Sequence, residues 1–333
     1  MATKPIDVIG YSPYRDGQQP GGAEPTEAQV RQDLSIIATL AKGIRIYSTT
    51  GIHAEIPRLA KNEGLEVWLG AWINKDEVSN QEQIDALIEQ AKSYKSTIKG
   101  LIVGSEVLFR KDLTPAQLVR YIQQVKDANT DIPVSTAEIY GIMKDNKAVL
   151  APAIDFVTTH IHPYWDGPKI DDAAEHVAKM WDTVRVAYPG KEVIVGETGF
   201  PTAGIKRGAA QPSLDNQVRV TVELIAKSKQ VGMKVMLFSA FDEKWKVVKT
   251  GDSDEGLVGG SWGLWGSNRE EKPVVAALRN LPVAIMTPDR KLRVIPAADA
   301  ALGGIDALGR LRLPSATTGA PAKALPVWTI SRP

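Results

Sequence analysis

Short apolar runs alternate along the chain with longer segments in which apolar residues recur every three or four positions. Val67-Trp68-Leu69 and Val193-Ile194-Val195 are continuous apolar runs, which is typical of strands buried on both faces of a parallel sheet. The pattern predicts strands at residues 6–11, 43–48, 65–72, 99–106, 132–138, 154–162, 192–198 and 233–241.

The segments between these runs have the apolar spacing of amphipathic helices. Thr114 is a good N-cap, and Pro115 is favoured as the first helical residue. A similar start is expected near Pro25 or Thr26. The pattern predicts a helix beginning within 26–34 and further helices at 81–93, 115–128, 171–188 and 215–231.

The alternation of strands and helices predicts a parallel sheet. Eight expected strands with helices between them favour a closed (β/α)8 barrel of the TIM type over an open doubly wound sheet. The first strand is followed by no Gly-x-Gly-x-x-Gly string, which weakens a dinucleotide-binding alternative. We expect one catalytic barrel at 1–280. Residues 281–333 are rich in Ala, Pro and Gly, which indicates either an appendage over the barrel or a linker.

Composition narrows the function classes. The chain has 333 residues, 43% hydrophobic and 24% charged, with a net charge of +1, so it is ordinary globular material. It has no long basic run, and we expect no nucleic-acid partner. The absence of cysteine excludes disulfides, cysteine zinc sites and a thiol nucleophile. No stretch approaches the roughly 18 apolar residues of a membrane span, so we expect no membrane contact. Residues 1–5 contain no apolar signal region.

Glu106 and Glu197 each lie at the end of an apolar run. The carboxyl ends of barrel strands form the face on which barrel enzymes carry out their chemistry. Two carboxylates there suit the cleavage of a glycosidic bond, with one acting as acid and base and the other as nucleophile. The alternative is that each is a solvated strand-end residue. Their similar positions on two similar strands favour the catalytic interpretation.

Several short strings resemble glycoside hydrolase family 17, the β-1,3-glucanases and their transglycosylating relatives. The resemblance covers roughly residues 6–280. The opening residues 10–17 are more similar to bacterial and fungal members than to plant ones, and we expect a bacterial subgroup. The strings are Arg45-Ile46-Tyr47, Val103-Gly104-Ser105-Glu106, His162-Pro163-Tyr164-Trp165, Gly196-Glu197-Thr198-Gly199-Phe200-Pro201-Thr202, Phe241-Asp242-Glu243 and Trp262-Gly263-Leu264-Trp265.

The resemblance implies a retaining enzyme that cleaves β-1,3-glucan through a covalent glucosyl-enzyme. Glu106 then matches the general acid/base and Glu197 the nucleophile. Ser105 stands where many relatives have an Asn that holds the sugar 2-hydroxyl, and serine has a shorter reach. No cofactor is implied, and the partner is a β-1,3-gluco-oligosaccharide or polysaccharide.

We favour transfer of the glucosyl group to another sugar, which elongates, branches or cyclises the glucan. Three alternatives stay open, and the first is endo-hydrolysis, in which water is the acceptor. A non-catalytic glucan-binding barrel is the alternative of another class. A phosphate-binding barrel is the third, although the loops after the last two expected strands contain no convincing phosphate cradle. A glucan substrate would favour the periplasm or the cell exterior.

The resemblance also assigns supporting residues. Glu243 and Lys246 match a Glu and a Lys of the family, and a positive charge there would balance the paired carboxylates. Their alternative is a solvated salt bridge in a loop. Tyr164 matches a tyrosine near the nucleophile, and Tyr47 could contact the sugar or the nucleophile. Either tyrosine could instead be a packing residue.

Tryptophans at strand ends or in the following loops are candidate sugar platforms, because the apolar face of a sugar stacks on an aromatic ring. Core packing is the alternative for each, and it is expected for Trp68. The spacing of His160 and His162 could suit a metal, but we expect these residues to line the sugar cleft and no metal to bind. The residues expected to contact sugar are Tyr11, Trp72, Ser105, His162, Trp165, Trp245 and Trp262.

Overall fold

The computed structural model describes residues 4–128, 130–250, 257–281, 283–286 and 292–295. The chain divides into two units, Met1–Val275 and Ala276–Pro333. In the second unit, strands β9 (Val283–Met286) and β10 (Leu292–Ile295) form a two-stranded antiparallel sheet. Most of the segment expected to be an appendage or linker lies outside the described residues.

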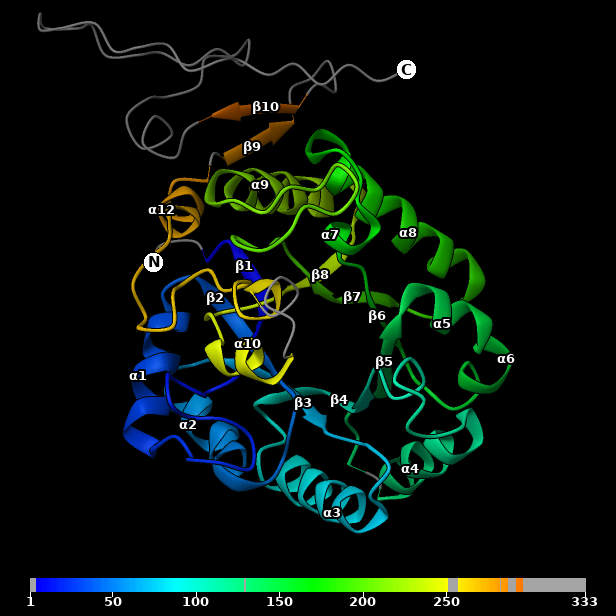
Figure 1. The fold of residues 1–333 in the computed structure, drawn as a ribbon. Helices are drawn as coiled ribbons and strands as arrows, with labels where there is room; N and C mark the ends of the chain where they lie inside the picture. The colour runs from blue at the N-terminus through cyan, green and yellow to red at the C-terminus, as the bar shows by residue number, and fades with distance from the viewer. Residues whose placement is uncertain (1–3, 129, 251–256, 282, 287–291, 296–333) are drawn as a thin grey trace, which may run out of the picture. The chain divides into compact units, whose positions relative to one another are not determined.

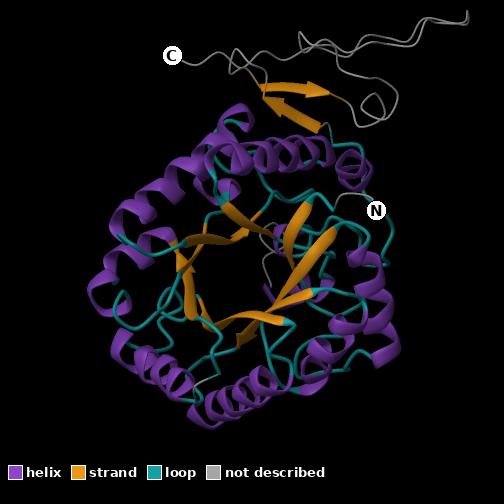
Figure 2. Ribbon diagram, turned by 180° about the vertical axis from the view of Figure 1, so that it is seen from behind, coloured by secondary structure: helices purple, strands orange, loops and turns teal. Residues whose placement is uncertain are grey.

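The first unit contains a closed barrel of eight parallel strands, which confirms the predicted (β/α)8 fold. Every strand pairs with the next one in sequence, and β1 pairs with β8 through Val8 and Met236 to close the ring. Figure 2 shows this ring with helices around its outside. The strands are β1 (Ile6–Gly10), β2 (Ala41–Ile46), β3 (Glu66–Ala71), β4 (Ile98–Ser105), β5 (Val134–Ile139), β6 (Val157–His160), β7 (Val193–Thr198) and β8 (Lys234–Leu237).

All five predicted helices are present, and several short ones were missed because they carry little periodicity (Figure 1). None of the helices within the described ranges is long and apolar enough to cross a membrane. The helices are α1 (Glu27–Ala38), α2 (Ile56–Asn62), α3 (Glu77–Ser93), α4 (Pro115–Asp127), α5 (Tyr140–Asp145), α6 (Lys147–Leu150), α7 (Pro163–Asp166), α8 (Ala173–Ala187), α9 (Leu214–Val231), α10 (Lys244–Thr250) and α12 (Pro273–Arg279), with 3-10 turns at Gly51–Glu55 and Ile170–Asp172.

Side-chain caps fix where four of the five long helices begin, α8 being the exception. Thr26 and Thr114 each form a capping box, with the glutamine three residues later returning the hydrogen bond. Such a box satisfies backbone N–H groups that have no partner inside the helix. Helix α3 begins four residues earlier than predicted, because the Asp76 side chain accepts from the N–H groups of Val78 and Ser79.

A cluster inside the barrel packs Val8, Phe156, Ile194 and Met236 against the partly buried ring of Trp68. Trp68 is therefore structural, as its place inside a strand predicted. The side chain also explains a neighbouring glycine, because a Cβ atom on Gly100 would lie 2.5 Å from the Trp68 ring.

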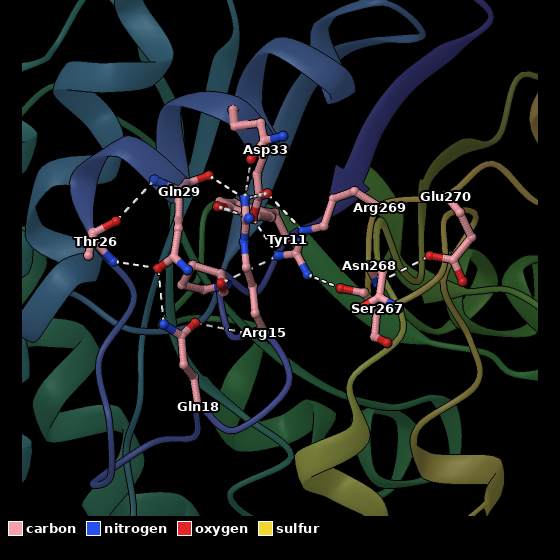
Figure 3. Close-up of polar contacts among 12 residues, drawn as sticks. Tyr11, Arg15, Gln18, Thr26, Gln29, Asp33, Ser267, Asn268, Arg269 and Glu270 are labelled. Atoms are coloured by element: carbon pink, nitrogen blue, oxygen red, sulfur yellow. Dashed lines mark hydrogen bonds and ion pairs between the residues drawn. The ribbon is translucent and has the colours of Figure 1, made fainter.

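A buried carboxylate ties the start of the barrel to its end (Figure 3). Asp33 of α1 is fully buried. It accepts hydrogen bonds from Arg15 at 2.7 Å and from Arg269 at 2.8 and 2.5 Å. The Tyr11 hydroxyl, just after β1, donates to the same carboxylate at 3.2 Å. The Asp33 network therefore joins the loop after β1, helix α1 and the loop that follows β8.

Asp33→Asn is expected to lower the free energy of unfolding by about 3 kcal/mol, because it leaves the buried guanidinium of Arg269 without a counter-charge. Denaturant titration followed by tryptophan fluorescence measures this. Asp7→Asn is the control, since Asp7 pairs with Lys42 on the surface and exposed pairs contribute little. Equal effects of the two substitutions would show that the Asp33 network does not hold the ends of the barrel together.

Candidate active site

Two carboxylates meet at the carboxyl end of the barrel. Glu106 directly follows β4, and Glu197 lies near the end of β7. One oxygen of each carboxylate and one ring nitrogen of His160 all lie within 4.8 Å of one another. This short separation is compatible with the close carboxyl pair of retaining glycosidases, which leaves no room for a water between the two groups.

Three basic side chains surround Glu197. Its side chain is 10% exposed, and its oxygens lie 3.4 Å from Arg45 Nη1, 3.2 Å from His162 Nε2 and 3.5 Å from His160 Nε2. Burial raises the pKa of Glu197, and the charge of a protonated His160, the His162 hydrogen bond and the charge of Arg45 hold it well below its ordinary value. If His160 is neutral, the His162 hydrogen bond and the charge of Arg45 still lower the pKa. Glu197 is therefore an ionised carboxylate near neutral pH.

The contact between Arg45 and His160 fixes the tautomer of the imidazole. Arg45 Nη1 lies 2.9 Å from His160 Nε2, and His160 Nδ1 lies 2.8 Å from Glu106 Oε1. A guanidinium only donates hydrogen bonds, so Nε2 must accept and the single ring proton must be on Nδ1. His160 is then neutral and donates to Glu106.

The neutral ring bears on the protonation of Glu106. Burial raises the pKa of Glu106, but the hydrogen bond from His160 and then the charge of a protonated His160 outweigh burial and hold the pKa below its ordinary value. The tautomer fixed by Arg45 removes that charge and keeps only the hydrogen bond. Burial and the negative charge of Glu197 both raise the pKa of Glu106. A neutral His160 opposes this rise with its hydrogen bond but not with a charge. Glu106 is the carboxyl of the pair that is suited to hold a proton.

Arg45 also organises the surrounding backbone. Its side chain is 1% exposed, and Nη1 donates to the Gly196 carbonyl at 2.8 Å. Its Nη2 donates to Ser105 Oγ at 3.2 Å. Ser105 lines the same cavity as the two carboxylates. Its hydroxyl oxygen accepts from Arg45, so one of its lone pairs is already used.

A cavity of about 650 Å³ opens beside the two carboxylates, and six of the predicted residues line it together with them. The Tyr47 hydroxyl is buried and has no hydrogen-bond partner of good geometry. Burial and then the negative charge of Glu197 raise its pKa, so this phenol is a neutral donor close to Glu197. The six residues are Tyr47, Trp72, Ser105, Glu243, Trp245 and Lys246.

The predicted pair of Glu243 and Lys246 is an ion pair on the cavity wall. Glu243 is 4% exposed, so the alternative of a solvated loop bridge does not describe it. The Lys246 ammonium also lies 4.8 Å from the ring centre of Phe238, and Trp245 Nε1 donates to Glu243 at 3.2 Å.

Three predicted site residues lie in the protein interior rather than in the cavity. Tyr11 is fully buried and donates to Asp33, which corrects its expected contact with sugar. Tyr164 is fully buried, and its hydroxyl donates to the Ile205 carbonyl at 2.8 Å, so it is not placed as a donor to Glu197. Trp262 is 4% exposed. This burial prevents its ring from serving as an open platform.

His162 and Trp165 are not among the residues that line the cavity. His162 contacts Glu197 and packs edge-on against Trp262, with ring centres 4.9 Å apart. Trp165 is 45% exposed, and the Arg207 guanidinium lies 4.9 Å from its ring centre. The exposed Trp165 ring packs against the buried Trp262 ring, with ring centres 6.3 Å apart.

Sequence reasoning gave no role to three charged residues of the site. Arg45 was only part of a resembling string, and Glu138 of β5 and Arg110 were not singled out. Arg110 lies 4.5 Å from the Trp72 ring centre and lines the cavity. A charged side chain inside an apolar strand run, as at Arg45 and Glu138, was the available signal, because such a residue is buried only with a partner.

The donor atoms of Glu106, His160 and Glu197 could in principle converge on a metal ion. The guanidinium of Arg45 donates to His160 and lies 3.4 Å from Glu197. A cation bound there would face that fixed positive charge, so these residues fit a metal poorly.

A family model described as the BtgE/BtgC glycoside hydrolase domain matches residues 8–263. A putative glucan endo-1,3-beta-glucosidase from Aspergillus niger is 33% identical over 75% of this chain and 40% of that protein. A glucan 1,3-beta-glucosidase from Saccharomyces cerevisiae is 28% identical over 79% of this chain and 90% of its own length. The chain therefore spans about two fifths of the Aspergillus relative.

Solved structures of glucan-active enzymes are also similar to this chain. A glycoside hydrolase family 17 beta-1,3-glucanosyltransferase from Rhizomucor miehei aligns with a TM-score of 0.71 at 29% identity, over 81% of this chain and 96% of that one. An endo-laminarinase from Formosa, at 18% identity and a TM-score of 0.70, shares the fold. The curated relatives named above are fungal, so they give the expected bacterial subgroup no support.

His162→Gln is expected to raise the pKa of Glu197 toward its ordinary value, because the substitution removes an imidazole that lowers it. Carboxyl 13C NMR titration measures this, with the Glu197 resonance assigned through Glu197→Gln. His176→Gln is the matched control, since His176 contacts Asp166 instead. A Glu197 pKa unchanged in His162→Gln would mean that the charge of Arg45 keeps the carboxylate ionised without help from His162.

Proposed function

The chain belongs to the BtgE/BtgC glycoside hydrolase family, and we propose that it cleaves β-1,3-glucan with retention of configuration through a covalent glucosyl-enzyme. The observation that carries the proposal is the unequal pair of carboxylates within 4.8 Å of each other. Glu197 is held ionised by its neighbours, while Glu106 faces a neutral N–H donor. A retaining mechanism needs this difference between its two carboxyl groups.

In the first step, the Glu197 carboxylate attacks the anomeric carbon, and the bond from that carbon to the leaving oxygen breaks. Glu106 gives its proton to the leaving oxygen and becomes a carboxylate. The His160 Nδ1–H, 2.8 Å from Glu106 Oε1, stabilises the new negative charge. Tyr47, close to Glu197, is placed to hold the nucleophile and the ester that it forms.

In the second step, Glu106 takes a proton from the acceptor hydroxyl, whose oxygen attacks the anomeric carbon. The bond to Glu197 breaks and returns that carboxylate to its starting charge. A sugar acceptor gives transfer, and water gives hydrolysis. Both outcomes use the same two carboxylates, so the acceptor surface decides between them.

We favour transfer to a sugar acceptor. The Rhizomucor miehei neighbour is a glucanosyltransferase, and Trp165 offers an exposed ring near the carboxylates, joined to Glu197 through Trp262 and His162. Endo-hydrolysis is the second candidate, because the Aspergillus niger relative is named an endo-1,3-beta-glucosidase. The presence of both carboxylates argues against a barrel that only binds glucan.

Glu106→Ala should slow cleavage of laminari-oligosaccharides by about 100-fold or more, because a sugar leaving group needs its proton. Cleavage of a β-glucosyl fluoride needs little protonation, so its rate should fall far less. Azide serves as the acceptor in this assay, because it can attack in the second step without a base. The β-glycosyl azide is the expected product. Fluoride release and product analysis measure both rates.

Glu197→Gln is the companion variant, and it should lose turnover on both donors while still binding oligosaccharide, because no nucleophile is left. If Glu106→Ala slows cleavage of both donors by the same factor, Glu106 is not the acid. Turnover of Glu197→Gln close to wild type would show that another group attacks the anomeric carbon.

Trp165→Ala should shift products from lengthened to shortened glucans, since a stacked sugar contact is worth on the order of 1 kcal/mol. The measurement is the ratio of the two product classes at fixed donor concentration. Trp72→Ala is the control, because Trp72 lines the cavity and should change donor cleavage more than the ratio. A constant ratio in Trp165→Ala would exclude the ring as an acceptor platform.

A further inference from the structure

Glu138 is a fully buried carboxylate on β5 that does not line the cavity and has no part in the steps above. Its oxygens accept two backbone hydrogen bonds, from the N–H of Leu108 at 2.6 Å and from the N–H of Phe109 at 3.2 Å. Both donors belong to the turn that begins at Glu106. A buried carboxylate that binds only this backbone calls for an explanation, because its desolvation is costly.

The turn that carries Glu106 has an unusual backbone. Glu106 itself has a φ of +56°, a left-handed conformation that costs a residue with a Cβ atom roughly 1–2 kcal/mol. Its carbonyl accepts from the Arg110 N–H at 2.9 Å, and the Val107 carbonyl accepts from the Asp112 N–H at 3.0 Å. Such a conformation persists only where the surroundings determine it.

Strand β5 holds this turn at two consecutive residues. The Ala137 carbonyl accepts from the Glu106 N–H at 2.7 Å, and Glu138 accepts from the N–H groups two and three residues further along. Arg110 adds a third restraint, since its guanidinium donates to the Ser105 carbonyl. Of these restraints, the carboxylate of Glu138 is the one that a side-chain substitution on β5 can remove.

We infer that Glu138 is a positioning residue, which anchors the turn after β4 and so keeps Glu106 aimed at the leaving oxygen. The inference rests on the proposed function, because it requires Glu106 to be the acid. An amide at this position offers one oxygen acceptor, and its NH2 group would face the second backbone N–H. Glu138→Gln therefore keeps the size of the side chain and loses half of the anchor.

The negative charge of an ionised Glu138 supports the same role as its hydrogen bonds. Burial raises the pKa of Glu138 to about 7, the N–H groups of Leu108 and Phe109 oppose that rise, and the charge of Glu106 adds to it. The interaction between two titrating carboxyls is mutual. An ionised Glu138 thus favours the protonated form of Glu106 that the first step needs.

The test compares two donors in Glu138→Gln, with azide as acceptor for the activated one. Cleavage of laminari-oligosaccharides should lose about tenfold or more in kcat with KM little changed, because a displaced acid loses part of its contribution. Release of fluoride from a β-glucosyl fluoride should change by less than about threefold. A role in stability alone would lower both rates by one factor, in proportion to the folded fraction.

Asp155→Asn is the matched control. The Asp155 carboxylate likewise accepts from a backbone N–H, that of Val134 at 2.8 Å, which lies at the opposite end of β5 from Glu138. Asp155→Asn should leave the donor ratio unchanged. Glu138→Asp, which keeps the charge and shortens the reach, should reproduce the donor difference if the amide variant does not fold. Equal losses on both donors in the folded variant would overturn the inference. A donor difference in Glu106→Ala, measured alongside, would show that the proposed function still stands.

Discussion

The guanidinium of Arg45 is the fixed charge on which the site depends. It is buried and permanently positive, and it reaches the Gly196 carbonyl, Ser105, His160 and Glu197 from one position on β2. A charge that cannot be released forces its neighbours to adapt their own protonation. Glu197 stays ionised, and His160 accepts at Nε2 and directs its single proton at Glu106. One strand residue thereby gives two chemically identical carboxyls different electrostatic surroundings.

The barrel makes this arrangement possible because its strands end on one face. Arg45, Glu106, His160 and Glu197 come from β2, the end of β4, β6 and β7, and no two of them are close in sequence. The closed ring of hydrogen bonds fixes the distances among these strand ends. The Asp33 network holds the loops after β1 and β8 to α1, and cavity residues lie on both loops.

The fold could be predicted from the sequence because most strand residues are buried and helices α1, α3, α4 and α9 begin at side-chain caps. Glu106 and Glu197 could be predicted as well, since each closes an apolar run and a resembling string surrounds it. Burial could not be assigned to single aromatic residues by the same means. Tyr11 lies between two cavity residues in sequence, yet its side chain is buried, and Trp262 is buried as well. The role of Glu138 depends on a turn in another strand, which periodicity does not describe.

In the proposed mechanism the reaction asks different things of the two carboxylates, and different forces hold them. Glu197 begins and ends each cycle as an anion, so an ion pair with Arg45 and the His162 contact can fix it in place. Glu106 must gain and lose a proton, and a strong ion pair would hold it in one state. Its position is instead set through the backbone, by a left-handed residue whose following N–H groups are bound to Glu138. A neutral His160 completes this arrangement, since it can donate to either form of Glu106 without adding charge.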